Sequence, residues 1–479
     1  MRRLPLTLLA ASLMLAIGSA NAATQTTVPA AAVKTAEQLR DKAMNDNTAY
    51  EIVSSVTTEV GPRLAGSPAD ARGREWAIAK FKALGFDKVY TEEVSYPLWE
   101  RRSEHAEIVA PFPQPLDLIA LGYSAGTPKG GLTAEVVKFD SLDALKSADP
   151  TKVKGKIVYV DARMTRQKDG HDYGMGSAVR VGGPVIAAKM GAAAFLLRSA
   201  GTDANSRTPH TGVTGFTGPD GAIPAAALSN PDADQLSRIV GYGKPVSIKL
   251  DLDVGFNGTY KGANVIGEVT GKTHPDQGVA IGGHLDSWDP GTGAIDDGAG
   301  VAIAMAAGKL IHDMPQRPDR TIRVIAFANE EMGLWGGKAY AEKHAKEVSK
   351  FQLGTESDFG AGKVWLMTAS VKPEARGAID QIAKVLAPIG VAYDASKPGG
   401  GGSDLSQMHG KGMAALTLVQ DGTNYFDYHH TANDTLDKID PKELAQNVAV
   451  YAAFSYMAAQ ADGDFGSAPG AFANDGAEE

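Results

Sequence analysis

The chain has 479 residues, of which 43% are hydrophobic and 22% are charged, a balance typical of a globular protein with a sizeable core and more than one domain. The formal net charge is −9 and no block of basic residues is present, which argues against a nucleic-acid-binding surface. The absence of cysteine excludes disulfide bonds, thiolate catalysis and cysteine-ligated metal sites.

Residues 1–22 have the features of a secretory signal peptide. Arg2 and Arg3 form a basic start, residues 4–17 form an apolar stretch, and residues 20–22 (Ala-Asn-Ala) fit the small-x-small cleavage pattern. We therefore predict cleavage after Ala22 and export to the periplasm or the medium. The apolar stretch is too short for a membrane span, and no later segment is apolar for long enough to cross a bilayer.

Residues 23–115 are predicted to begin with helices and to continue into a strand. Helical periodicity covers residues 35–60 and 70–84, and the second helix is expected to stop at Gly85. Residues 89–96 then alternate between apolar and polar side chains, as a strand does. We assign this segment, together with residues 261–465, to one discontinuous domain.

The segment between these two parts has a different composition. Three prolines punctuate residues 111–115, and short apolar runs at residues 156–160, 193–197 and 246–252 predict strands. Residues 185–190 predict a helix that ends at Gly191. We interpret residues 116–260 as a small, β-rich domain inserted into the larger one.

From residue 263 onward, predicted strands and helices alternate. Strands are expected at residues 279–281, 321–328 and 414–419, and helices at residues 299–312, 335–346 and 443–459. This alternation favours an α/β fold with a mainly parallel sheet and helices on both of its faces. Residues 466–479 are rich in glycine, alanine and acidic residues, so we expect a disordered tail.

Acidic residues and histidines follow the predicted strands of this α/β part. His284 and Asp286 follow the first strand, and Glu330 and Glu331 follow the second. Further candidates lie in residues 294–300 and 428–435 and at Asp358. Because α/β sheets bind ligands at the carboxyl ends of their strands, we expect these side chains to share one cleft.

This set of side chains favours a metal site. A buried carboxylate is costly unless it is paired or binds a metal, and zinc accepts imidazole nitrogen and carboxylate oxygen. Two zinc ions about 3.5 Å apart need one shared carboxylate and about two further ligands each. Five residues supply that number: His284, Asp296, Glu331, Asp358 and His430. Glu330 is left over beside a ligand, where it can deprotonate a water molecule between the metals.

A second motif points to a different chemistry. Residues 122–126 match Gly-x-Ser-x-Gly, but a serine nucleophile of that kind must lie between a strand and an immediately following helix. Residues 127–131 (Thr-Pro-Lys-Gly-Gly) cannot start a stable helix, so we do not expect serine catalysis.

In this order, the motifs resemble the M28 family of zinc aminopeptidases and carboxypeptidases. The likeness covers most of the chain after the signal peptide and includes residues 63–67, 283–287, 296–300, 329–331, 356–358 and 430–435. Residues 284–289 and the doubled histidine at 429–430 look like the carboxypeptidase Q branch. Residues 153–158 and 187–193 resemble a protease-associated (PA) domain, which implies that the inserted segment is PA-like.

The resemblance implies a role for each metal ligand. Asp296 would bridge two Zn²⁺ ions, His284 and Asp358 would complete one site, and Glu331 and His430 would complete the other. Asp296 and His430 each have an identical neighbour, Asp297 and His429. The spacing to residue 300 favours Asp296, and the residues that follow favour His430.

Two catalytic residues are also implied. Glu330 would be the general base, and Asp286 would hold the ring of His284 in the tautomer that binds metal. The family then implies an exported exopeptidase with two Zn²⁺ per chain that hydrolyses the terminal peptide bond of short peptides or dipeptides.

The end of the substrate that is recognised stays open. The branch likeness favours carboxypeptidase or dipeptidase action, but no Arg or Lys within the ligand motifs could bind a terminal carboxylate, so an aminopeptidase is an alternative. A single-zinc transferase similar to glutaminyl cyclase and a non-catalytic, receptor-like module are two further alternatives. Association into a homodimer is also left open.

Overall fold

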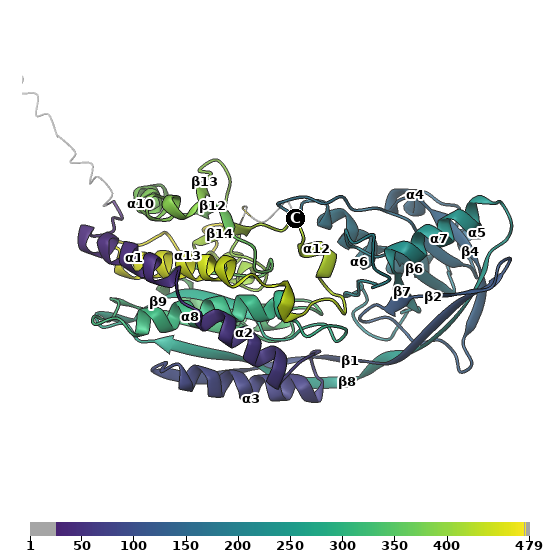
Figure 1. Ribbon diagram of the computed structural model, residues 1–479, viewed down its shortest axis with the longest axis horizontal. Helices are drawn as coiled ribbons and strands as arrows, with labels where there is room; N and C mark the ends of the chain where they lie inside the picture. Colours follow the sequence, from purple (N-terminus) through teal and green to yellow (C-terminus); the bar gives the residue numbers. More distant parts are fainter. Residues whose placement is uncertain (1–24, 474, 476–479) are drawn as a thin grey trace, which may run out of the picture.

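The computed structural model describes residues 25–473 and residue 475, so the predicted signal peptide lies outside the described residues. Figure 1 shows two lobes of unequal size. Strands β1 (Lys88–Ala110) and β8 (Ser247–Val269) pair antiparallel and run from one lobe into the other. Residues 111–246, between these strands, form the small lobe, and the remaining described residues form the large lobe.

The large lobe contains a sheet with strand order β13-β12-β14-β11-β9-β10-β8. Its strands, besides β8, are β9 (His274–His284), β10 (Arg320–Phe327), β11 (Phe351–Glu356), β12 (Val364–Ser370), β13 (Ala392–Tyr393) and β14 (Ala415–Gln420). The central strands β14, β11, β9 and β10 are parallel to one another. The predicted α/β architecture with a mainly parallel sheet is therefore confirmed.

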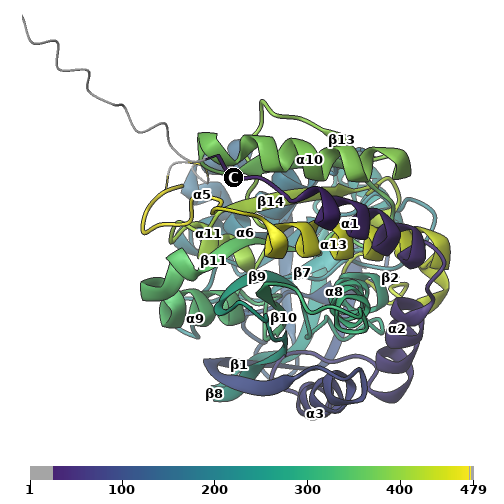
Figure 2. The same cartoon turned by 90° about the vertical axis from the view of Figure 1, so that its left-hand side faces the viewer.

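Helices cover both faces of this sheet (Figure 2). One face carries α1 (Ala30–Ala43), α2 (Thr48–Glu59), α3 (Pro68–Ala83), α8 (Ala299–His312), α10 (Arg376–Leu386) and α13 (Pro441–Gln460), whose buried side chains form the main core. The other face carries α9 (Trp335–His344) and α11 (Leu405–His409), which form a second core with strand residues. The short helix α12 (Tyr425–Tyr428) precedes the doubled histidine.

Local sequence signals account for the helix boundaries. Helix α8 has the predicted bounds, because its small and apolar residues are buried along almost its whole length. Helix α3 starts two residues before the predicted start, since the Ser67 hydroxyl accepts the Asp70 N–H at 3.1 Å and caps the helix. The predicted helix over residues 35–60 is two helices, and Asp46, whose carboxylate accepts the Thr48 N–H, stands in the break between them.

The small lobe is a mixed α/β unit and not the β-rich domain that we expected. Its strands are β2 (Gln114–Leu116), β3 (Leu118–Ala120), β4 (Leu132–Phe139), β5 (Ile157–Val160), β6 (Ala194–Arg198) and β7 (Ala225–Leu228), and its helices are α4 (Leu142–Lys146), α5 (Pro150–Val153), α6 (Tyr173–Lys189) and α7 (Asn230–Gly241). Strands β4 to β7 are parallel, and α6 and α7 cover opposite faces of them. Four glycines and a proline in α6 hid most of this helix from the sequence pattern.

Two predicted boundaries differ from the structure. The expected end of the insertion, residue 260, falls inside β8, because the lobes share a continuous strand in place of a linker. Part of the expected disordered tail is ordered. The Ala468 and Gly470 N–H groups donate to the carbonyls of Gly412 and Lys411, each at 3.0 Å, which ties the tail to the turn after α11.

Candidate metal centre

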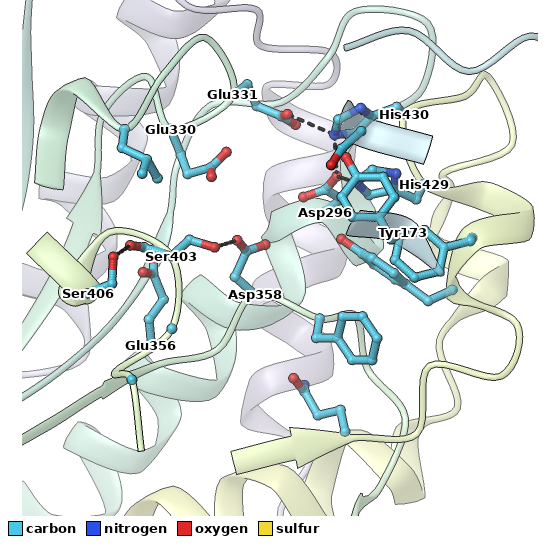
Figure 3. A pocket seen from close by; sticks show the side chains of 18 of the residues that line it. Tyr173, Asp296, Glu330, Glu331, Glu356, Asp358, Ser403, Ser406, His429 and His430 are labelled. Carbon is cyan, nitrogen blue, oxygen red and sulfur yellow. Dashed lines mark hydrogen bonds and ion pairs between the residues drawn. The ribbon is translucent and has the colours of Figure 1, made fainter. Parts of the chain in front are cut away.

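The candidate residues meet at one edge of the central sheet. His284 is the last residue of β9, Glu330 and Glu331 follow β10, and Asp358 follows β11. Because β9, β10 and β11 are parallel, their carboxyl ends lie side by side and bring these side chains into one cleft, as Figure 3 shows for Glu330, Glu331 and Asp358.

The first group of metal-ligand atoms consists of His284, Asp296 and Asp358. The Nε2 atom of His284 lies 3.0 Å from Oδ1 of Asp296 and 3.3 Å from Oδ1 of Asp358. The other ring nitrogen, Nδ1, donates to the main-chain carbonyl of Asp286 at 3.0 Å. This hydrogen bond fixes the tautomer and leaves the Nε2 lone pair facing the two carboxylates.

A second group lies on the other side of Asp296. The Oδ2 atom of Asp296 is 3.2 Å from Nε2 of His430, which in turn is 2.9 Å from Oε2 of Glu331. Nδ1 of His430 donates to the carbonyl of Thr211 at 3.1 Å, so Nε2 is again the free ligand atom. Asp296 is therefore flanked by histidine ring nitrogens on both of its carboxylate oxygens.

The ligand atoms that lie closest together on this side of Asp296 come from Asp296, His430 and His429. The sequence interpretation left His429 out of the ligand set, and Glu331 adjoins these atoms through His430. Nε2 of His429 is 3.4 Å from Oδ2 of Asp296, and the two neighbouring histidine rings are stacked with their centroids 3.5 Å apart. Burial lowers the pKa of His429 well below its usual range, so this ring is neutral. Unlike His430, it has no hydrogen-bond partner for Nδ1 among the described residues, so its orientation is less firmly fixed.

Asp296 and Asp297 face different surroundings. Asp297 accepts the His284 N–H at 3.0 Å and the Gly300 N–H at 2.9 Å, so it ties the end of β9 to the start of α8. A Cβ atom at Gly300 would lie 1.9 Å from the carbonyl oxygen of Ser357, which is why glycine is needed there. Asp297 is occupied by the backbone, and Asp296 points into the cleft.

The loop that carries Asp296 is held from two sides. Asp434 accepts the N–H groups of Ala294 and Ile295 at 2.8 and 2.7 Å. The buried guanidinium of Arg63 donates to the carbonyls of Thr292 and Gly293 at 2.8 and 2.9 Å. Both residues lie in motifs that the sequence interpretation noted without a role, and the structure shows that each positions the loop.

Glu330 lines the cleft but belongs to neither group of ligand atoms. Burial and the nearby charge of Asp358 raise the pKa of its carboxyl well above its usual range. Its backbone N–H donates to Oδ1 of Asp286 at 3.0 Å, whereas that oxygen is 3.7 Å from Nδ1 of His284. The carboxylate of Asp286 thus positions the backbone of Glu330. We expected this carboxylate to orient the His284 ring, but the main-chain carbonyl of Asp286 does so instead.

The arrangement fits metal ions well. Oδ2 of Asp296 and Oε1 of Glu331 are buried and have no hydrogen-bond partner among the described residues. Buried carboxylate oxygens without partners are costly, and a cation between them and the imidazole nitrogens removes that cost. The nitrogen and oxygen donors are the set that zinc prefers.

The cleft above these residues has a volume of about 820 Å³ and includes side chains from both lobes. Tyr173 and Arg180 of α6 line it, and Figure 3 shows Tyr173 beside His429. Sequence reasoning missed both residues. The one available signal was that Arg180 is the single charged residue between Tyr173 and Lys189 in an otherwise small and apolar segment.

The described structure also bears on the Gly-x-Ser-x-Gly motif and on membrane-spanning segments. After Ser124 of the Gly-x-Ser-x-Gly motif, the next helix of the described chain is α4, which starts only at Leu142. Over the described residues, no helix has both the length and the apolar character that crossing a membrane requires.

Comparison with known proteins agrees with the site. The model of peptidase family M28 matches residues 264–455. Carboxypeptidase Q of Bos taurus is 34% identical over 413 residues, which cover 86% of this chain and 85% of that protein. The crystal structure of a peptidase M28 precursor from Shewanella amazonensis SB2B superimposes with a TM-score of 0.87 at 48% identity, over 91% of this chain and 98% of that one.

More distant structures share the fold. The zinc aminopeptidase BSAP from Bacillus subtilis superimposes with a TM-score of 0.61 at 21% identity, over 85% of this chain and 94% of that one. The fold and the site together define a metal-dependent exopeptidase. The chain belongs to peptidase family M28, and it is a zinc metallopeptidase.

Proposed function

We propose that this protein is an exported exopeptidase that binds two Zn²⁺ ions and cleaves the terminal peptide bond of short peptides or dipeptides. The observation that carries the two-metal part is the position of Asp296, whose Oδ1 is 3.0 Å from Nε2 of His284 and whose Oδ2 is 3.2 Å from Nε2 of His430. Export rests on the N-terminal sequence alone. The likeness to carboxypeptidase Q favours carboxypeptidase or dipeptidase action over aminopeptidase action.

In this proposal His284 and Asp358 would hold one ion, His430 and Glu331 would hold the other, and Asp296 would serve both. Zinc, when bound, would make a water molecule more acidic and would polarise the scissile carbonyl.

Glu330 moves the protons of the reaction. Its carboxylate takes a proton from the attacking water, the water oxygen bonds to the scissile carbonyl carbon, and the carbon–nitrogen bond then breaks. Glu330 returns the proton to the departing amine, so no other acid is required. Asp286 keeps Glu330 in place through the backbone hydrogen bond at 3.0 Å.

Purified protein is expected to contain close to two zinc ions per chain, and removal of zinc by a strong chelator should abolish peptide hydrolysis. The measurement is elemental analysis alongside a dipeptide assay before and after zinc is restored. Asp296→Asn should lose most of the metal, whereas His105→Gln, at an exposed histidine, should keep it. One zinc per chain with full peptide hydrolysis would overturn the two-metal mechanism, one zinc without hydrolysis would favour the single-zinc transferase, and a protein without zinc would favour the non-catalytic module.

Short substrates should be strongly preferred over long ones. Because the small lobe contributes Tyr173 and Arg180 to the wall of the cleft, we propose that it closes one end of the substrate path. We therefore expect dipeptides and tripeptides to be hydrolysed, and a ten-residue peptide blocked at both ends to stay intact by mass spectrometry. Internal cleavage of that peptide would show that the small lobe does not limit access.

A further inference from the structure

Arg180 is a buried cation without a charged partner. Its side chain lies in the wall of the cleft, the residue is 6% exposed, and neither Nε nor Nη1 has a hydrogen-bond partner among the described residues. The guanidinium forms a cation–π contact with the ring of Tyr173, whose centroid lies 5.4 Å from the guanidinium carbon. An aromatic ring compensates only part of the cost of removing a guanidinium from water.

The other buried arginines of the described chain are all satisfied. Arg63 and Arg320 donate to main-chain carbonyls, and Arg198 pairs with two aspartates. Arg180 therefore differs from them, because two of its buried donors have no partner among the described residues while the residue lines the cleft. Such an arrangement costs stability and suits a residue whose partner is a ligand.

The backbone around Arg180 is shaped to admit the guanidinium. A Cβ atom at Gly212 would lie 2.4 Å from the Arg180 guanidinium carbon, so the planar group packs directly on the backbone there. The preceding residue, Thr211, accepts the hydrogen bond that orients His430. One short segment thus positions both Arg180 and a metal ligand.

The charge of Arg180 stands out within the cleft. Among the described residues that line it, Arg180 is the one Arg or Lys, and six others are Asp or Glu: Asp169, Asp296, Glu330, Glu331, Glu356 and Asp358. A carboxylate that entered this cleft would find one permanent cation. Arginine suits that role because its planar donors match the two oxygens of a carboxylate.

The position also suits the end of a peptide. Tyr173 contacts both Arg180 and His429, with its ring centroid 5.0 Å from that of His429, so one aromatic side chain lies between the guanidinium and the doubled histidine. A carboxylate held by Arg180 would therefore lie on the same side of the cleft as the doubled histidine, where the residue that follows the scissile bond could end.

We propose that Arg180 binds the free α-carboxylate of the substrate, which makes the enzyme a carboxypeptidase or dipeptidase that removes a single carboxyl-terminal residue. This inference rests on the proposed peptidase function and adds which end of the substrate is recognised. It supplies the cationic group that the ligand motifs lack.

The test compares alanyl-leucine with alanyl-leucinamide, which differ only in the carboxylate. Wild-type enzyme should hydrolyse the free acid with a kcat/KM at least tenfold higher than the amide. Arg180→Met should raise KM for the free acid by about tenfold to a hundredfold, the range for a charge-assisted pair, with little change in kcat and no change for the amide. Arg180→Lys should have a KM for the free acid between those of wild type and Arg180→Met. Arg238→Gln, at an exposed arginine of the same lobe, should have the same KM as wild type.

Thermal unfolding separates this role from a structural one. Because the guanidinium pairs with no carboxylate among the described residues and contacts only the ring of Tyr173 as a charge partner, Arg180→Met should unfold at the same temperature as wild type or higher. A lower unfolding temperature together with equal losses for acid and amide would overturn the proposal. So would a wild-type enzyme that hydrolyses both substrates equally well.

Binding distinguishes failure of this proposal from failure of the proposed peptidase function. Calorimetry of the zinc-loaded protein should show that leucine binds more tightly than leucinamide, and that Arg180→Met removes the difference. If neither peptide is hydrolysed but this difference is present, the peptidase function fails while carboxylate recognition by Arg180 stands. If peptides are hydrolysed but leucine and leucinamide bind equally well, recognition by Arg180 fails while the peptidase function stands.

Discussion

Glu330→Gln should lower kcat by about two to four orders of magnitude, the usual contribution of general acid–base catalysis. Glutamine keeps the size and shape of glutamate but cannot take a proton from water. Because the Glu330 carboxylate pairs with none of the proposed ligands among the described residues, whereas Glu331 pairs with His430, the zinc content should stay the same. Steady-state kinetics together with elemental analysis on the same preparation provide the measurement.

Glu331→Gln is the matched comparison, since it changes the neighbouring residue in the same way. Oε2 of Glu331 lies 2.9 Å from Nε2 of His430, so the loss of its charge should weaken one metal site. Activity lost in this variant should partly return with excess zinc, which should not rescue Glu330→Gln. If Glu330→Gln loses zinc while Glu331→Gln keeps it, the two roles are reversed. Near-normal turnover by Glu330→Gln would mean that metal alone activates the water.

Arg63→Ala should destabilise the fold by about 3–5 kcal/mol, because it leaves three main-chain carbonyls without their donor. Arg63 is fully buried and donates to the carbonyls of Leu285, Thr292 and Gly293. Each carbonyl left without a donor costs about 1–3 kcal/mol, and alanine replaces none of the donors. The free energy of unfolding in urea measures the effect.

The metal content should fall together with stability in Arg63→Ala. Gly293 lies three residues before Asp296, so loss of its anchor frees the loop that presents this carboxylate. Arg63→Lys should recover only part of both quantities, because an ammonium group cannot span three carbonyls as a guanidinium does. Arg317→Ala is the control: its ion pair with Asp87 lies near the surface and should contribute about 0–1 kcal/mol. If Arg63→Ala and this control behave alike, Arg63 does not hold the loop.

The sequence alone was sufficient where the signal is local. Helix α8 has its predicted bounds, and β10 begins and ends within one residue of the prediction, because an uninterrupted apolar pattern of the right period specifies each element. The same holds for the candidate ligands. His284 ends one strand of the parallel sheet and Glu331 and Asp358 follow two others, so their meeting at one edge follows from the α/β pattern itself.

Adjacent residues of one type were beyond the reach of sequence spacing. Asp296 and Asp297 differ by one position, and only the fold shows that Asp297 accepts the N–H groups of His284 and Gly300 while Asp296 faces the cleft. The same applies to His429 and His430, which both approach Asp296. The path of the backbone decides which of two adjacent side chains faces the cleft. That path depends on distant segments, such as the one around Arg63.

The sequence by itself thus determined the α/β class, the family likeness and the strand ends that carry the candidate ligands, because these depend on periodicity and on short motifs. Only the tertiary structure extended β1 to Ala110, since its partner β8 lies more than a hundred residues away in the chain. Only the tertiary structure brought Arg180 of the small lobe into the cleft. Contacts between segments that are remote in sequence leave no local pattern, because the free energy that selects them comes from burial and pairing in the assembled fold.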